Sequence, residues 1–277
     1  MHTAAPIEAH IAVVPLPNLG PDAYANEKPL TSEGARSIFG GLLVAQAVSA
    51  ASATVPDVFR LYSLQSSFLA PANGREDVVY RVDRTADGRV YSARIVRAVQ
   101  GESCVYVATV SFHNVNESVG RVLRYGPPML DLDGAVPDDV DRSDASLVVW
   151  HAGYVGAIHI RRSFVRSSAL STDNPVVHLA AFAYTSDEFS FGPALAANPM
   201  EVGKGMRNVA LGASLTHSVS FHDPRARMDK WIVLERGTSW GADGRVLVDQ
   251  KIWDMESGRL VMSGTQEGLI RLKGPRL

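Results

Sequence analysis

Residues 42–53 read LLVAQAVSAASA, a run that contains no proline or glycine and is apolar on nearly every side. Alanine and leucine are strong helix formers, and a helix without a polar face must be surrounded by other elements. Val55-Pro56 follows and ends the run, because helical geometry is disfavoured before a proline. We therefore predict a buried helix here, which the rest of the chain must cover.

Strand-like runs follow this helix, separated by short turns. Asp87-Gly88 and Gly101-Glu102 are turn pairs typical of hairpins. The predicted strands span residues 61–69, 77–84, 90–100 and 103–113. The first half is therefore predicted to be one buried helix and a meander of long antiparallel strands, preceded by a proline-rich arm over residues 1–24.

A segment rich in aspartate and proline interrupts this pattern over residues 116–149, and we predict a linker or surface loop there. The same order of elements then returns. We predict a strand over 156–165, a helix from Asn174-Pro175 to about Asp187, and strands over 210–222, 231–238, 245–254 and 259–271. These boundaries predict an N-terminal unit over 1–115 and a C-terminal unit over 150–277.

Short identities indicate that the second half repeats the first. Asp87-Gly88-Arg89-Val90 recurs as Asp243-Gly244-Arg245-Val246, an offset of 156 at which Thr109 falls on Thr265. Ser67-Phe68-x-x-Pro71 matches Ser220-Phe221-x-x-Pro224 at an offset of 153. A helix lying on a strongly curved antiparallel sheet is the hotdog shape. The predicted fold class is therefore α+β, a double hotdog in which two repeats of a long helix are wrapped by a curved antiparallel β-sheet.

Bulk composition narrows the possible functions. The chain has 277 residues, 46% of them hydrophobic, which is enough for a packed core. A net charge of −2 does not suggest a nucleic-acid partner, and no apolar run reaches the roughly 18 residues of a membrane-spanning helix. The only cysteine is Cys104, so no intrachain disulfide forms. The N-terminus lacks a secretory pattern, and Pro275-Arg276-Leu277 loosely matches a peroxisomal address, so we expect a cytoplasmic or peroxisomal protein.

Several familiar motifs are excluded by their context. Residues 237–241 match the Gly-x-Ser-x-Gly pattern of serine hydrolases, but a turn and a strand follow instead of a helix, and no histidine occurs after His222. The chain contains no His-Glu-x-x-His pattern, no cysteine cluster and no glycine-rich nucleotide-binding fingerprint. We therefore expect neither a metal nor a cofactor.

A set of short motifs occurs in a specific order along the two halves. The first half contains Ile38-Phe39-Gly40-Gly41 with Gln46, Ser66-Ser67-Phe68-Leu69-x-Pro71, and Asp87-Gly88-Arg89-x-Tyr91-x-x-Arg94. The second half contains Ala183-Tyr184-Thr185-Ser186-Asp187, Ser214-Leu215-Thr216-His217-Ser218-x-x-Phe221-His222, and Gln266-Glu267-Gly268-Leu269-Ile270-Arg271. This set resembles the acyl-CoA thioesterase II family over residues 25–272, in the family's order and spacing.

The resemblance implies hydrolysis of a thioester by direct attack of water, without an acyl-enzyme. Its three catalytic groups carry over to Asp187, Ser214 and Gln266. These side chains suit the chemistry, because a carboxylate accepts the proton of the attacking water, and a hydroxyl and an amide fix the orientation of that water. The developing oxyanion needs backbone N–H donors, and the start of the first helix at Gly40 and Gly41, or its counterpart in the second half, is expected to supply them.

Further residues are expected to bind the substrate. Phe68 and Tyr62 belong to the strand that the resemblance places along the acyl tunnel, and Arg94 is a candidate for a phosphate of coenzyme A. At the repeat offsets, Ser214 falls on Leu61 and Gln266 falls on Val110. The first half therefore lacks two of the three polar groups, and we expect one active site per chain.

The chain departs from the family pattern around the expected acyl tunnel. Thr216 replaces an aspartate, Tyr62 and Gln65 stand where histidines are common, and Ser67 replaces a tyrosine. These changes suggest an unusual acyl group, such as a product of secondary metabolism, or altered chemistry. The carrier of the acyl group, coenzyme A or a carrier protein, stays open. Exposed sheet edges favour a homodimer or a larger homo-oligomer.

Two other functions remain open at this point. Asp173 to His178 keeps the Asp-to-His spacing of hotdog hydratases, with asparagine and proline displaced by one position. A non-catalytic acyl-binding protein is the third possibility, and the presence of all three water-holding groups argues against it.

Overall fold

The computed structural model describes residues 5–27, 37–117, 145–155 and 160–274, together with residues 120, 123, 125–129, 131, 132, 134 and 137. Its first half contains two helices, α1 and α2, and six strands. In chain order these are α1 (Pro6–Ile11), β1 (Val13–Pro15), β2 (Ala23–Asn26), α2 (Gly40–Ser52), β3 (Phe59–Phe68), β4 (Val79–Asp87), β5 (Tyr91–Gln100) and β6 (Ser103–Asn114).

The second half repeats the plan with additional short helices. Its elements are β7 (Val148–Val155), β8 (Ile160–Arg166), α3 (Pro175–Asp187), α4 (Gly192–Ala196), α5 (Pro199–Val202), β9 (Val209–Phe221), β10 (Ile232–Ala242), β11 (Arg245–Asp254) and β12 (Leu260–Leu272). The predicted helices and the strands of both meanders are confirmed, with boundaries displaced by a few residues. The sequence did not indicate α1, β1, β7, α4 or α5. Of the predicted strand over 156–165, residues 156–159 lie outside the described residues.

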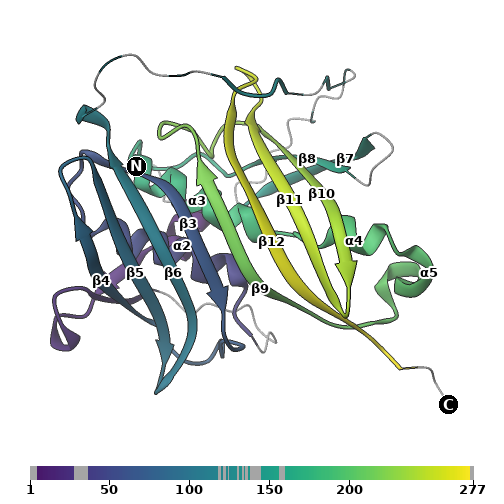
Figure 1. Cartoon of the computed structure of the whole chain (residues 1–277), viewed down its shortest axis with the longest axis horizontal. Helices are drawn as coiled ribbons and strands as arrows, with labels where there is room; N and C mark the ends of the chain where they lie inside the picture. Colours follow the sequence, from purple (N-terminus) through teal and green to yellow (C-terminus); the bar gives the residue numbers. More distant parts are fainter. Residues whose placement is uncertain are drawn as a thin grey trace.

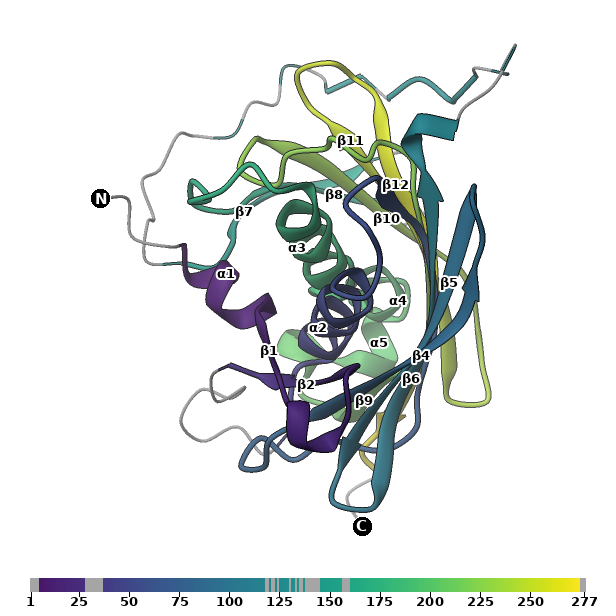
Figure 2. The same cartoon turned by 90° about the vertical axis from the view of Figure 1, so that its left-hand side faces the viewer.

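The described strands form one antiparallel sheet of twelve, in the order β1-β2-β4-β5-β6-β3-β9-β12-β11-β10-β8-β7 (Figure 1). The two halves join at the centre, where β3 pairs with β9 from Ser63↔Ser220 to Ser67↔Thr216. The sheet curves around α2 and α3, which lie side by side on its inner face (Figure 2). This arrangement is the double hotdog predicted from the repeat.

The two long helices are buried because their sequences leave no polar face. In α2, ten of the thirteen residues are buried, including every position from 41 to 48. Helix α3 begins after Asn174, whose side chain accepts a hydrogen bond from the Val176 N–H, and Pro175 occupies its first turn. Gly41 permits close packing, because a Cβ there would lie 2.6 Å from the Tyr184 carbonyl oxygen of α3. The start of α2 therefore lies against the end of α3.

Strand registers confirm the repeat at residue level. Leu64 pairs with Val110 in the first half, and His217 pairs with Gln266 in the second. These pairs correspond at the predicted offsets of 153 and 156. The predicted offset is wrong for the strand on the other side of β6 and of β12. There Val110 pairs with Arg94 of β5, whereas Gln266 pairs with Val248 of β11. Strands β5 and β11 therefore correspond at an offset of 154, two residues from the offset that their turn motif indicates.

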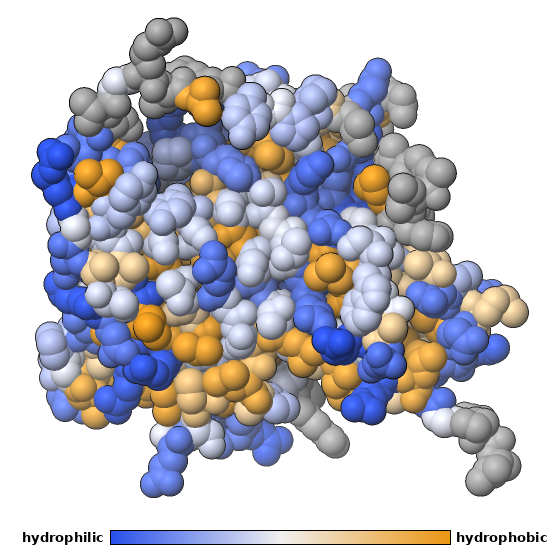
Figure 3. All heavy atoms as spheres, in the orientation of Figure 1, coloured by the Kyte–Doolittle hydropathy of each residue, from blue (hydrophilic) through white to orange (hydrophobic). Residues whose placement is uncertain are grey.

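The outer face of the sheet carries a second apolar cluster in the C-terminal half. Phe164, Val233 and Trp253 form it, and Met129 and Leu132 of the connecting segment pack against it. Over the rest of this face polar and apolar residues are intermixed (Figure 3). No helix in the described part of the chain is long and apolar enough to cross a membrane. Residues 275–277, the predicted peroxisomal address, lie outside the described residues.

Candidate active site

Asp187 is the last residue of α3, and its carboxyl group lies in the interior. Only 5% of the residue is exposed. The helix ends here because Glu188 takes an extended conformation, with φ −67° and ψ 123°. The Gly41 N–H at the start of α2 interacts with the Asp187 carboxylate. The antiparallel packing of α2 and α3 therefore brings a helix N-terminus to the carboxylate at the end of the neighbouring helix.

Two strands of the second half supply the other predicted catalytic groups. Ser214 on β9 donates a hydrogen bond of 3.1 Å from Oγ to Asp187 Oδ1. The Gln266 amide on β12 donates to the same oxygen, and to Ser214 Oγ over 2.7 Å. Ser214 is partly exposed, whereas Gln266 is 1% exposed. The structure therefore brings together the three side chains that the sequence singled out.

The local strand geometry explains why both side chains reach Asp187. His217 is directly opposite Gln266, and Ser214 is opposite Gly268, with a register shift between Glu267 and Gly268. Without this irregularity, residues 214 and 217 would point to opposite faces of β9, because side chains alternate along a strand. The bulge therefore places Ser214 and Gln266 on the same inner face.

Burial gives the Asp187 carboxyl an unusual acidity. Loss of solvation raises its pKa from 3.8 to about 6, although hydrogen bonds from Gln266 and Ser214, the charge of Arg236 and the Gly41 N–H act in the opposite direction. A carboxyl group with this pKa is ionised at neutral pH and is more basic than an exposed aspartate. It is therefore suited to accept a proton from a bound water.

Gly40 and Phe68, two of the residues expected to bind the oxyanion or the substrate, lie beside this group. A Cβ at Gly40 would lie 2.6 Å from Asp187 Oδ2 and 2.9 Å from the Phe68 ring, so only glycine leaves both in place. Phe68 in turn packs edge-on against Tyr106, with ring centroids 5.1 Å apart. The tyrosine is fully buried. These residues give the carboxylate an apolar wall on the side of the first half.

Arg94 and Tyr62 lie elsewhere, and the expectation that they bind substrate at this site is corrected. Arg94 is completely buried and donates to Thr54 Oγ1, the Thr54 carbonyl and the Asp87 carboxylate, so its guanidinium is already occupied near the end of α2. Tyr62 is 40% exposed and packs edge-on against Tyr91. A register shift between Leu61 and Ser63 marks its position in β3.

The residues of the hydratase motif do not form a site. Asp173 is exposed and forms an ion pair with Arg227. His178 is 1% exposed, and its Nδ1 accepts a hydrogen bond of 3.2 Å from the Met228 N–H. No hydrogen bond joins Asp173 and His178 in the described residues. The acid and base of a hydratase are therefore not assembled here.

Sequence reasoning missed the buried polar residues behind the carboxylate. Arg236 on β10 and Gln250 on β11 lie on the inner face, where Arg236 donates to carbonyl groups at the end of α3. The sequence could have revealed Arg236. It follows the buried Leu234 by two residues along a strand, so its side chain must point to the same face. A charged residue at a core position of a strand should have been singled out.

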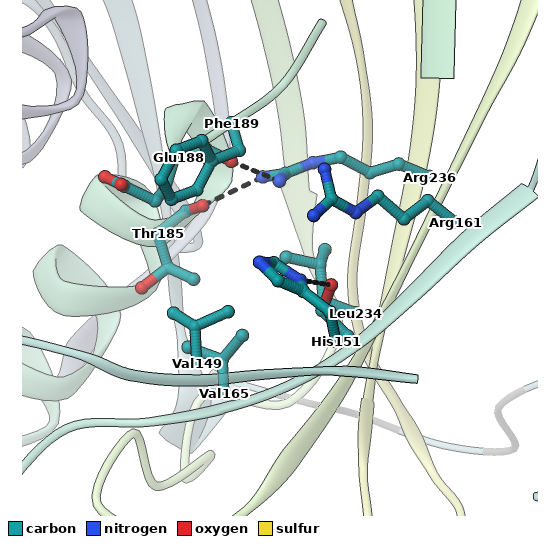
Figure 4. Close-up of a pocket in the computed structure, with 10 residues that line it drawn as sticks. Val149, His151, Arg161, Val165, Thr185, Glu188, Phe189, Leu234 and Arg236 are labelled. Carbon is teal, nitrogen blue, oxygen red and sulfur yellow. Dashed lines mark hydrogen bonds between the residues drawn. The ribbon is translucent and has the colours of Figure 1, made fainter. Parts of the chain in front are cut away.

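Three cavities lie around the helix pair and the sheet, and none of the three is lined by Asp187, Ser214 or Gln266. A small one of about 20 Å³, room for roughly one water, is shown in Figure 4 beyond the last turn of α3. A second, of about 210 Å³, lies at the other end of the helix pair. A third, of about 1030 Å³, lies between Pro127-Pro128 and the outer face of β9–β12. The Asp187 carboxylate faces the inner side, so the outer cavity is not its binding site.

The fold and the buried Asp–Ser–Gln group define a double-hotdog protein with a polar site in one half. Residues 29–113 match the acyl-CoA thioesterase N-terminal domain family, and residues 125–270 match the corresponding C-terminal domain family. Acyl-coenzyme A thioesterase 8 from Homo sapiens is 27% identical over 268 residues, which cover 86% of this chain and 82% of the human protein.

Solved structures agree with this match. The acyl-CoA thioesterase II TesB2 from Mycobacterium marinum superposes with a TM-score of 0.78 at 25% identity, over 98% of this chain and 99% of that one. A hotdog-fold protein from Alicyclobacillus acidocaldarius reaches a TM-score of 0.70 at 17% identity, over 99% and 100%, and shows the fold alone. The chain belongs to the acyl-CoA thioesterase II family.

Proposed function

We propose that this chain hydrolyses acyl-CoA thioesters with a single water-activating site built from Asp187, Ser214 and Gln266. The observation that carries the proposal is that Ser214 on β9 and Gln266 on β12 both donate to one carboxylate oxygen of Asp187 at the end of α3. The family match supports the substrate class, and the acyl chain length is not part of the proposal.

The groups present account for a complete reaction. Water attacks the thioester carbonyl carbon while Asp187 accepts one of its protons. The carbonyl oxygen then becomes an oxyanion, for which the proposed donor is the Gly40 N–H at the start of α2, because the Gly41 N–H already interacts with Asp187. Collapse of the tetrahedral intermediate breaks the carbon–sulfur bond. The proton on Asp187 passes to the departing thiolate, which gives a free carboxylic acid and coenzyme A.

Ser214 and Gln266 hold the base and its water in place. Because both donate to Asp187 Oδ1, they fix the carboxylate in one orientation and leave Oδ2 on the side of Gly40 and Phe68. This side of the carboxylate faces the junction of the two halves. We place the reacting carbonyl there, with the apolar rings of the first half beside it.

Release of coenzyme A over a panel of acyl-CoA chain lengths, followed with a thiol reagent, tests the proposal. Asp187→Asn should lower kcat by about 10²–10⁴-fold, because it removes the base and keeps the shape. Asp173→Asn is the matched control, since Asp173 is an exposed aspartate paired with Arg227, and it should keep wild-type activity. Wild-type protein that releases no thiol from any substrate, or full activity in Asp187→Asn, contradicts the proposal.

Assembly, location and unit boundaries also remain proposals. We propose a homodimer or larger homo-oligomer, which light scattering after size exclusion tests directly. A cytoplasmic or peroxisomal location is tested by imaging the tagged chain in cells. The proposed units are residues 1–115 and 150–277, with a linker over 116–149. Limited proteolysis that cuts first within this linker would support these boundaries.

A further inference from the structure

Arg236 is a buried cation beneath the last turn of α3. It lies on β10, is 6% exposed, and donates hydrogen bonds of 2.9 Å to the carbonyl oxygens of Thr185 and Ser186, as well as one to the carbonyl of Glu188. Figure 4 shows the guanidinium reaching this turn from across the small cavity. These three carbonyls belong to the turn that carries Asp187. One side chain therefore holds the backbone on both sides of the base.

The same guanidinium begins a polar chain that leads to Gln266. Arg236 donates to Gln250 Oε1 over 3.3 Å, and Gln250 Nε2 donates to His217 Nε2 over 3.2 Å. Burial and the positive charge of Arg236 lower the pKa of His217 to about 3, so the ring is neutral. Because Nε2 accepts a hydrogen bond, the single ring proton lies on Nδ1.

The end of this chain faces the catalytic amide. His217 is the direct cross-strand partner of Gln266, and both side chains are on the inner face. Two buried atoms in this pair, His217 Nδ1 and Gln266 Oε1, have no hydrogen-bond partner among the described residues. One is a donor and the other an acceptor, at side chains about 5 Å apart at their Cβ atoms. The two atoms are not bonded directly, and a single water between them would satisfy both.

We propose that Arg236 is a positioning residue for hydrolysis, which fixes the turn that carries Asp187 and, through Gln250 and His217, the orientation of the Gln266 amide. This inference rests on the proposed function. The orientation matters because only the NH₂ end of Gln266 can donate to Asp187 and Ser214. A reversed amide would place its oxygen against the carboxylate and its NH₂ against the His217 N–H. The chain to Arg236 disfavours that state.

Arg236 also acts on Asp187 through its charge. The ionisable groups around it are Asp187 at the end of α3 and Glu188 just beyond it, His151 on β7, Arg161 on β8 and His217 on β9. Arg236 keeps its proton at neutral pH, although burial lowers its pKa to about 10. Its positive charge lowers the pKa of Asp187. Removing the charge should therefore move the acid limb of the pH profile to higher pH, whereas a purely structural role would leave that limb in place.

The test compares Arg236→Met, Arg236→Lys and Gln250→Leu with Arg161→Met as the matched control. Arg161 lines the same cavity, but none of its hydrogen bonds reaches the end of α3 in the described structure. Arg236→Met should lower kcat by about 10–100-fold with KM within about threefold, and raise the pH of the acid limb. Arg236→Lys should keep the acid limb of the pH profile at its wild-type position but retain only part of the wild-type kcat, because lysine lacks the planar guanidinium with its several N–H donors. Gln250→Leu should lower kcat and leave the limb unchanged.

A second measurement does not depend on turnover. Amide hydrogen exchange over residues 184–189 should accelerate in Arg236→Met and remain at the wild-type rate in Arg161→Met. Unchanged kcat, acid limb and exchange in Arg236→Met overturns the inference even if the wild-type enzyme is active. If that variant does not fold, Arg236→Lys and Gln250→Leu with wild-type kcat overturn it equally. A wild-type protein without thioesterase activity instead removes the proposed function, and faster exchange would still show the support of the turn.

Discussion

The two halves of the chain share one framework and differ at the three positions that form the polar site of the second half. Where the second half has Ser214 and Gln266, the register places Leu61 and Val110 in the first. When the two thirteen-residue helices are aligned end to end, Asp187 falls on Ser52. One half therefore carries a buried carboxylate with two hydrogen-bond donors, and the other carries a serine and two apolar side chains.

The difference also appears in the space at each end of the helix pair. The counterpart of the active site is a cavity of about 210 Å³, which Ser52, Leu61, Phe112 and the start of α3 line. At the opposite end of the helix pair, Asp187, Ser214 and Gln266 are hydrogen-bonded to one another instead. A buried charge is stable only where donors surround it. Two equal sites would double that cost, and the first half avoids it by keeping an apolar core.

Both halves do support their long helix with a buried arginine, although from different strands. Arg94 on β5 donates to the Thr54 carbonyl beyond α2, and Arg236 on β10 donates to carbonyls at the end of α3. Arg94 is neutralised by Asp87, whereas Arg236 faces Asp187 and Glu188. The same capping task is therefore linked to the proposed base, Asp187, only in the second half.

The largest expected effect comes from making the second half resemble the first. Gln266→Leu removes both donors of the amide while nearly keeping its volume, and it should lower kcat by about 10²–10³-fold. Steady-state thiol release measures this. The control is Gln65→Leu, because Gln65 is exposed on the outer face of β3. Comparable losses in both variants would show that the inner-face position is not what matters.

The pH dependence of hydrolysis is the next effect. Asp187 must be ionised to accept a proton, and its pKa is about 6. kcat/KM should therefore be constant above about pH 7 and fall about tenfold for each pH unit below 6. A profile over pH 4.5–8.5 in buffers of constant ionic strength measures the limb. A limb near pH 4, typical of an exposed aspartate, contradicts the buried position of the base.

Placing the polar residue of the second half into the first should destabilise the fold. Val110 is fully buried, and its strand neighbours Leu64 and Arg94 offer no free donor or acceptor at this position. Val110→Gln therefore buries an unpaired amide and should lower the free energy of unfolding by about 1–3 kcal/mol. Urea denaturation followed by circular dichroism measures it. Val107→Gln, a partly exposed position on the same strand, should be nearly neutral.

The catalytic carboxylate should itself cost stability. The folded pKa of Asp187 is about 6, above the value of 3.8 for the free side chain. Its stabilising contribution is complete below pH 3.8 and is lost as the pH rises through 6. The free energy of unfolding of Asp187→Asn should therefore exceed that of the wild type by on the order of 2 kcal/mol at pH 8, as measured by denaturant titration. This difference should disappear near pH 4. Equal stability at both pH values would indicate that the site carries no such strain.

The sequence predicted most of the fold, and it singled out Asp187, Ser214 and Gln266, for identifiable reasons. The helix of residues 42–53 has no polar face, and the paired turn motifs fix the two meanders. Asp187, Ser214 and Gln266 were identified because each belongs to a motif of several residues. Strand β7 was missed because Val148–Val155 follows a proline- and aspartate-rich segment without a turn signal. The capping roles of Arg94 and Arg236 depend on where a helix ends in space, which spacing along the chain does not reveal.

The smallest expected effect on hydrolysis comes from a comparison of Tyr62 and Phe68, which lie on opposite faces of β3. Phe68 and Tyr62 both lie on β3 and were both predicted to contact substrate, but Phe68 lies beside Gly40 and Asp187 whereas Tyr62 contacts Tyr91. Residues 62 and 68 would share a face in a regular strand, and the register shift between Leu61 and Ser63 puts them on opposite faces.

Tyr62→Ala should therefore leave kcat/KM within about twofold of wild type and lower stability by about 0.5–1 kcal/mol, the value of an exposed cross-strand aromatic pair. Phe68→Ala should instead raise KM or lower kcat, because it opens the apolar wall beside the base. Both are measured by thiol release and thermal unfolding of the same preparations. If Tyr62→Ala impairs hydrolysis as strongly as Phe68→Ala, substrate reaches the outer face of β3, and the contrast between the two faces fails.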